Sequence, residues 1–144
     1  MIKEATIDEV KLLAELAIKM WNQATIEELT KDFEEIVKDS NKICFIKYIN
    51  KEAVGFAYCG KRTDYVEGTS SSPVGYLEGI YILEKHRRCG LALELLQNCE
   101  TWAKKQGCKE FASDCELNNH DSLAFHLATG FEEANRIICF RKDI

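Results

Sequence analysis

The most constraining feature of this sequence is a strand-like run that leads through a short basic turn directly into an amphipathic helix. Residues 75–82, Gly-Tyr-Leu-Glu-Gly-Ile-Tyr-Ile, have the β-branched and aromatic content typical of a buried strand. From residue 91 onward, apolar side chains repeat at helical spacing: Leu91, Leu95, Leu96, Cys99, Trp102 and Ala103. This order of strand, tight turn and helix predicts a sheet with helices packed on it.

The turn itself, residues 87–92, has the properties of an anion-binding site. The first N–H groups of a helix have no partner within it, and the positive end of the helix dipole lies behind them. Gly90 and Ala92 let a ligand approach the backbone closely, and Arg87 and Arg88 add positive charge. From spacing alone, a phosphate or pyrophosphate site and a solvated basic surface turn are both open. No Gly-Lys-Ser/Thr follows Gly90, and only one glycine is present, which argues against a Walker loop and a dinucleotide fingerprint.

Length and charge narrow the class of protein. With 144 residues we expect one domain spanning residues 1–144. The net charge of −5 argues against nucleic acid as a partner. No apolar run approaches the roughly 18 residues of a membrane span, and Met1–Ala5 lacks the apolar region of a secretion signal, so we expect a cytoplasmic protein.

The chain contains seven cysteines but no Cys-x-x-Cys pair. We therefore expect free thiols, mostly buried, and no metal site. Cys89 is the exception to watch, because it begins a helix beside two arginines, a setting typical of reactive thiols. No base lies near it in the sequence, so we assign it no catalytic role.

The remaining chain reads as alternating elements. The boxes Thr6–Glu9 and Thr25–Glu28 predict two helix starts, and Trp21, at the end of the first helix, is either a core aromatic or a wall beside a ligand cleft. The other expected elements are strand 2–5, the hairpin strands 42–49 and 53–61, the long loop 62–73, strand 110–115, helix 122–129, and Phe131 with 137–140 closing the sheet.

This order of elements resembles the fold of the GCN5-related N-acetyltransferases (GNAT). Arg87-x-x-Gly90-x-Ala92 fits that family's pyrophosphate loop, and residues 123–131 resemble its final helix and Gly-Phe signature. Five further segments are similar to the aminoglycoside 6′-N-acetyltransferases: 65–69, 72–81, 86–88, 102–104 and 110–114. The resemblance implies an α/β (α+β) fold with a mixed central sheet flanked by helices, in which two parallel strands splay at the acetyl-CoA site.

The resemblance also implies site residues. Acetyl-CoA would be the co-substrate, with no metal, and a cationic aminoglycoside the acceptor. The residues implied for the coenzyme are Ile80, Tyr81 and Ile82 for the pantetheine arm, Arg87, Arg88, Cys89, Gly90, Leu91 and Ala92 for the pyrophosphate, and Asn119 for the arm. The residues implied for the aminoglycoside are Trp21, Tyr65, Glu78 and Asp114.

Three of these residues are candidates for catalysis. Glu78 would accept the proton of the attacking amine, and Asp114 would orient the ligand. His126 stands where the family commonly has a tyrosine acid, and it is either a hydrogen-bond donor to the coenzyme sulfur or a structural histidine. The resemblance further suggests a homodimer built through the C-terminal strands.

Two other functions remain open at this point. One is acetylation of a different amine, such as a polyamine or a protein N-terminus. The other is a non-catalytic domain that binds coenzyme A as a sensor or scaffold. The long 62–73 loop with Tyr65 favours an enclosed small-molecule pocket, and the two carboxylates favour catalysis over simple binding.

Overall fold

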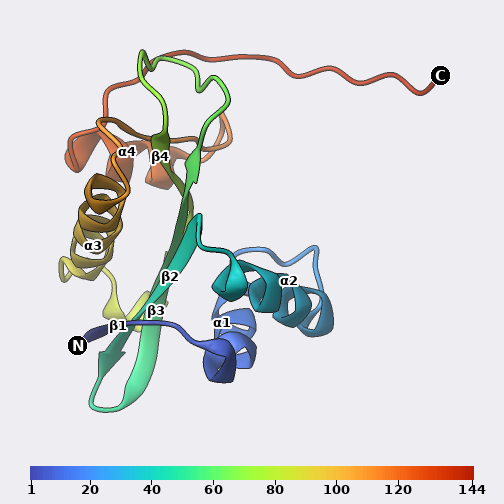
Figure 1. Ribbon diagram of the computed structural model, residues 1–144. Helices are drawn as coiled ribbons and strands as arrows, with labels where there is room; N and C mark the ends of the chain where they lie inside the picture. Colours follow the sequence, from blue (N-terminus) through green and yellow to red (C-terminus); the bar gives the residue numbers. More distant parts are fainter.

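The computed structural model describes residues 1–144, and its centre is a five-stranded sheet (Figure 1). The strands lie in chain order: β1 (Ile2–Glu4), β2 (Lys42–Ile49), β3 (Glu52–Arg62), β4 (Val74–Ile82) and β5 (Phe111–Ser113). The first four pair in antiparallel fashion, whereas β5 runs parallel to β4. The predicted mixed sheet is therefore confirmed.

Helices cover both faces of this sheet. They are the 3₁₀ turns Ile7–Glu9 and Glu84–His86 and the helices α1 (Val10–Ala17), α2 (Ile26–Lys38), α3 (Leu91–Lys105) and α4 (His120–Ala128). In Figure 1, α1 and α2 lie on one side of the sheet, and α3 and α4 lie on the other. No helix is both long and apolar enough to cross a bilayer.

The two predicted helix starts are present as local hydrogen bonds. The Glu9 carboxylate accepts from the backbone N–H of Thr6 at 2.7 Å, and the Thr25 hydroxyl accepts from the N–H of Glu28 at 3.1 Å. The first helix, however, ends at Ala17, so the prediction that it runs to Trp21 was wrong. A turn follows instead, held by the bond from the Trp21 N–H to the Ala17 carbonyl at 2.7 Å.

Each face of the sheet has its own core. Phe33 of α2 and Phe56 of β3 belong to the cluster beneath α1 and α2, and their rings meet edge to face with centroids 5.9 Å apart. Ala57, the next residue of β3, belongs to the cluster beneath α3, together with the fully buried Leu95. Neighbouring residues of one strand thus serve opposite faces, as the pleat of a strand requires.

Strand β4 has two irregularities at the place where the candidate site lies. In its register with β3, Gly79 lies opposite Tyr58 and Leu77 lies opposite Cys59, so Glu78 has no partner. This is a β-bulge, which breaks the strand's alternation and redirects a side chain. On its other side, β4 pairs with β5 only over residues 75–77, and residues 78–82 continue without a neighbour. The predicted splay of the parallel strands is therefore present.

The predicted closing strand is wrong. Residues 131–144 form no helix or strand, and the end of the chain runs away from the body as an extended segment (Figure 1). Ile138 and Phe140 are 81% and 90% exposed. Phe131, in contrast, packs against Phe111 and His126 with ring centroids 6.2 and 4.9 Å apart. Residues 137–140 have the apolar, β-branched character of a strand, but they pair with neither edge of the sheet.

All seven cysteines are free thiols, as expected. Four are buried and three, Cys89, Cys115 and Cys139, are exposed. Burial raises the pKa of Cys44 and of Cys108.

Candidate active site

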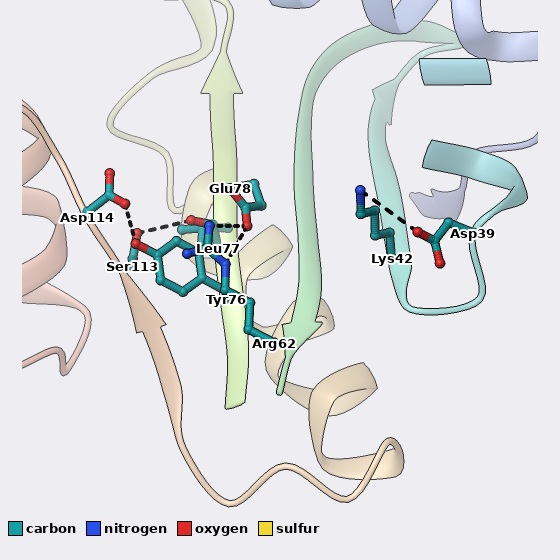
Figure 2. A network of polar contacts seen from close by, with 8 residues as sticks. All are labelled: Asp39, Lys42, Arg62, Tyr76, Leu77, Glu78, Ser113 and Asp114. Atoms are coloured by element: carbon teal, nitrogen blue, oxygen red, sulfur yellow. Dashed lines mark hydrogen bonds and ion pairs between the residues drawn. The ribbon is translucent and has the colours of Figure 1, made fainter. Parts of the chain in front are cut away.

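Polar side chains from β3, β4 and β5 lie close together near the point where β4 and β5 separate (Figure 2). The β-bulge places Glu78 one residue beyond the last residue of β4 that pairs with β5, and Asp114 follows directly on the end of β5. The sequence predicted that these two carboxylates meet at one cleft, where parallel strands end. The structure brings both into a single network.

Glu78 is bound by an arginine. Arg62, the last residue of β3, donates to Glu78 Oε1 from Nε at 3.1 Å and from Nη2 at 2.6 Å. The Arg62 guanidinium carbon also lies 3.5 Å from the centre of the Tyr76 ring, a cation–π contact. Partial burial opposes the charge of Arg62, but the hydrogen bonds to Glu78 raise its pKa above the ordinary value.

Asp114 is bound by a tyrosine. The Tyr76 hydroxyl donates to Asp114 Oδ2, which joins Asp114 through the ring of Tyr76 to Arg62 and so to Glu78. Tyr76 is only 7% exposed. Its burial, and then the bond to Asp114, raise its pKa above the ordinary value of about 10, so it remains a donor throughout the neutral range.

His126 is bound from two sides within the protein. Its Nδ1 lies 2.6 Å from the Ser122 carbonyl oxygen, one turn earlier in α4, and its Nε2 lies 2.8 Å from the hydroxyl of Ser113 in β5. Ser113 in turn approaches the Leu77 carbonyl at 3.3 Å. The ring therefore connects α4 to the last paired residues of β4 and β5.

The turn before α3 has the geometry expected of an anion site. The backbone N–H groups of residues 88–93 donate to no group of the protein, and the first helical bond runs from the Glu94 N–H to the Gly90 carbonyl. Gly90 is left-handed, with φ +78°, and the space where a Cβ would stand is open to at least 4 Å. These N–H groups at the start of a long helix have no acceptor, and no side chain at Gly90 blocks the approach of a ligand to them. They therefore fit the pyrophosphate of acetyl-CoA.

The two arginines of the turn differ in their surroundings. Arg87 donates from Nε to the Ile82 carbonyl at 2.9 Å, and its guanidinium lies 5.2 Å from the Tyr81 ring, so it ties the turn to the end of β4. Arg88 is exposed and left-handed, with φ +63°. Cys89 is exposed, and its thiol donates to the Arg87 carbonyl at 3.5 Å.

The remaining predicted residues lie in separate places. Asn119 caps α4, its side-chain oxygen accepting from the Ser122 N–H at 3.1 Å. Trp21 packs on Phe33, as expected of a core aromatic, and it also lines a cavity of about 470 Å³ beneath α2. Tyr65 is 75% exposed, and its hydroxyl makes no hydrogen bond within the chain.

The loop that carries Tyr65 is fastened at both flanks. The Glu110 carboxylate accepts from the Ser70 N–H at 2.9 Å and from the Ser71 hydroxyl, and these bonds lower the pKa of Glu110. The Asn135 amide donates to Glu67 at 3.0 Å, which links the loop to the C-terminal segment. The loop is therefore held against the body of the protein by side-chain hydrogen bonds.

Three members of the network were missed in the sequence: Arg62, Tyr76 and Ser113. The position of each gave a weak indication that it lies near the site. Arg62 ends a hairpin strand, Tyr76 lies two residues before Glu78, and Ser113 precedes Asp114. None of these positions reveals its contact, because the β-bulge at Glu78 cannot be read from composition or periodicity.

In this mixed sheet the parallel strands β4 and β5 separate, and beside them the first N–H groups of α3 have no acceptor within the protein. This is the arrangement implied for a coenzyme A-dependent acyltransferase. The model of the acetyltransferase (GNAT) family matches residues 10–131, and the chain belongs to this family. It is thus an acetyl-CoA-dependent N-acetyltransferase.

Its relatives are similar over nearly their whole length. The aminoglycoside N(6′)-acetyltransferase type 1 of Acinetobacter haemolyticus is 37% identical over 99% of this chain and 98% of its own. The enzyme of the same name from Serratia marcescens is 39% identical over 95% and 96%. The solved structure of the aminoglycoside acetyltransferase AAC(6′)-Iy with the bisubstrate analogue CoA-S-monomethyl-acetylneamine has a TM-score of 0.95 and 35% identity, covering 100% of this chain and 98% of that one. The same protein with CoA gives a TM-score of 0.96, covering 100% and 95%.

Proposed function

We propose that this enzyme transfers the acetyl group of acetyl-CoA to the 6′-amine of aminoglycosides. The observation that carries this function is the full-length similarity to enzymes that bear this activity in their names, at 37% and 39% identity. The match to a protein solved with a joined coenzyme–acetylneamine analogue agrees with it. An aminoglycoside is a polycation, and the network at the splay offers it two carboxylates, Glu78 and Asp114.

We assign the coenzyme to one side of the opening. Ile80, Tyr81 and Ile82 lie on the part of β4 that has no β5 neighbour, so backbone groups on that side can meet the pantetheine arm. The Ile82 carbonyl is the exception, because Arg87 Nε already donates to it. The N–H groups of residues 88–93 supply donors for the pyrophosphate. When bound, acetyl-CoA supplies an activated thioester, so the protein needs no covalent intermediate.

The protein's contribution is then position and proton transfer. An alkyl amine with a pKa near 10.4 is neutral in only about one molecule in 2,500 at pH 7, so a group that accepts its proton is required. We assign that role to Glu78, whose Oε2 accepts no hydrogen bond within the chain. Asp114, fixed by Tyr76, is assigned to orienting the cationic ligand, and Trp21 and Tyr65 to the walls of its site.

The function is tested by measuring thiol release from acetyl-CoA with pairs of aminoglycosides that bear either an amine or a hydroxyl at the 6′ position. Turnover is expected only with the 6′-amine member of each pair. Equal turnover of both members would contradict the regiochemistry. Turnover of neither would favour a different amine, and tight coenzyme binding without any turnover would favour a sensor.

We further propose that the enzyme is a cytoplasmic homodimer. The apolar run at residues 137–140 is exposed and unpaired, and pairing with a second copy would bury it. Seven free thiols suit the reducing conditions of the cytoplasm.

A further inference from the structure

The guanidinium group of Arg62 lies where the cationic acceptor is expected to bind. Arg62 directs two N–H donors at one oxygen of Glu78 and lies over the face of Tyr76. A carboxylate beside an aromatic face is also a good binding site for an ammonium group. The acceptor amine must therefore either displace Arg62 or share Glu78 with it.

The hydrogen-bond pattern favours sharing. Both Arg62 donors, Nε and Nη2, go to Oε1, while Oε2 accepts no bond within the chain. Displacement would break two charge-assisted hydrogen bonds and one cation–π contact together. Sharing breaks none of them and leaves Oε2 free to receive the amine.

We infer that Arg62 is a positioning residue, which holds Glu78 by Oε1 so that Oε2 receives the proton of the acceptor amine. This inference rests on the proposed function and on the role assigned to Glu78 in it. The proton passes from the amine nitrogen to Oε2, while both Arg62 hydrogen bonds stay in place. A planar guanidinium fixes a carboxylate more rigidly than a lysine ammonium does, because its donors lie in one fixed plane.

The test compares Arg62→Lys and Arg62→Gln with the wild-type enzyme in steady-state acetylation of a 6′-amine aminoglycoside. Arg62→Gln should lower kcat by about 10- to 100-fold, since a misplaced catalytic group costs rate, while KM for the aminoglycoside changes by less than about threefold. Arg62→Lys should recover part of kcat, because the charge remains but the fixed fork is lost. The wild-type rate measured alongside tests the proposed function by itself.

A double-mutant cycle separates positioning from a merely structural role. In the Glu78→Gln background, Arg62→Gln should have almost no further effect on kcat, because there is no carboxylate left to position. Lys3→Gln is the matched control: Lys3 pairs with Glu9 on the far edge of the sheet, and its side chain is 43% exposed against 44% for Arg62. This control should leave kcat unchanged.

Two results would overturn the inference. If Arg62→Gln lowers the aminoglycoside KM and leaves kcat unchanged, the arginine is a competitor that the substrate displaces. If Arg62→Gln lowers kcat by the same factor with and without Glu78, the arginine acts through the fold and not through the carboxylate.

Discussion

His126 Nε2 lies 2.8 Å from the hydroxyl oxygen of Ser113, which joins the last helix of the chain to the end of β5. On the other side of the ring, Nδ1 lies 2.6 Å from the Ser122 carbonyl, which can only accept. Nδ1 therefore carries a hydrogen, and in a neutral ring Nε2 accepts from Ser113 when that hydroxyl turns from the Leu77 carbonyl to the ring. Both nitrogens are thus engaged within the protein.

His126→Phe is expected to affect stability more than rate. The substitution removes the ring's hydrogen bonds to the Ser113 hydroxyl and to the Ser122 carbonyl, which should lower the free energy of unfolding by about 1–3 kcal/mol. Acetyl transfer should fall by less than tenfold. Denaturant unfolding and thiol release measure the two quantities, and Ser113→Ala, which removes the partner instead, should show the same order of effects. A loss of rate above 100-fold with unchanged stability would assign His126 as the general acid.

Glu78→Gln should give a defect that depends on pH. Without the carboxylate, the reaction relies on amine that is already neutral, and that fraction rises about tenfold per pH unit below the amine's pKa. The ratio of wild-type to variant kcat/KM should therefore be largest near pH 7 and shrink as the pH rises. Asp114→Asn serves as the comparison, because it should raise KM without this pH dependence. A Glu78→Gln defect of equal size at every pH would mean that Glu78 only binds the acceptor.

How far the sequence predicted this molecule depends on whether a feature is local. The strand at residues 75–82 and the helix that begins at residue 91 were predicted correctly, because periodicity and the turn glycine are properties of neighbouring residues. Arg62 and Tyr76 were missed because their contacts depend on the β3–β4 register, which the bulge at Glu78 shifts. Residues 137–140 were assigned to the sheet because strand propensity does not say whether a segment finds a strand to pair with.

Gly79→Ala should displace Trp21, which we assigned to a wall of the proposed acceptor site. A Cβ at this position would lie 2.8 Å from Cζ2 and 2.9 Å from Cη2 of Trp21, too close for a stable contact, so we expect the indole to move. Overpacking of this kind should lower the free energy of unfolding by about 1–3 kcal/mol, and the aminoglycoside KM should rise several-fold. Trp21 emission, read in a Trp102→Phe background, should shift.

Gly60→Ala is the control for that variant. Its Cβ would also be crowded, 3.1 Å from the Asn41 carbonyl, but it has no contact with Trp21. It should cost stability without shifting the emission. An unchanged Trp21 emission in Gly79→Ala would contradict the predicted contact.

Tyr76→Phe should flatten the alkaline limb of the stability curve. Burial and the bond to Asp114 raise the pKa of Tyr76 in the folded protein above about 10, its value in the unfolded chain. Above pH 10 the unfolded chain loses this proton while the folded protein keeps it, so stability falls as pH rises, by up to about 1.4 kcal/mol per pH unit. Denaturant unfolding between pH 8 and 11, under reducing conditions, should show this fall in the wild type and a shallower one in Tyr76→Phe. Burial also raises the pKa of Tyr58, so Tyr58→Phe should flatten the curve similarly, and parallel curves for all three proteins would contradict the assignment.

Ile138→Asp combined with Phe140→Asp should convert the proposed dimer to a monomer. The two side chains are 81% and 90% exposed in one chain, and residues two apart lie on the same face of a strand. If this face is buried against a second copy, each charge must be placed in an apolar interface, which costs several kcal/mol and opposes association. Sedimentation equilibrium should give the mass of two chains for the wild type and one for the double variant. Lys142→Glu is the control, because it changes the charge of the same segment outside the apolar run, and it should remain dimeric. A monomeric wild type, or a double variant that is still a dimer, would contradict a role of the C-terminal segment in dimerisation.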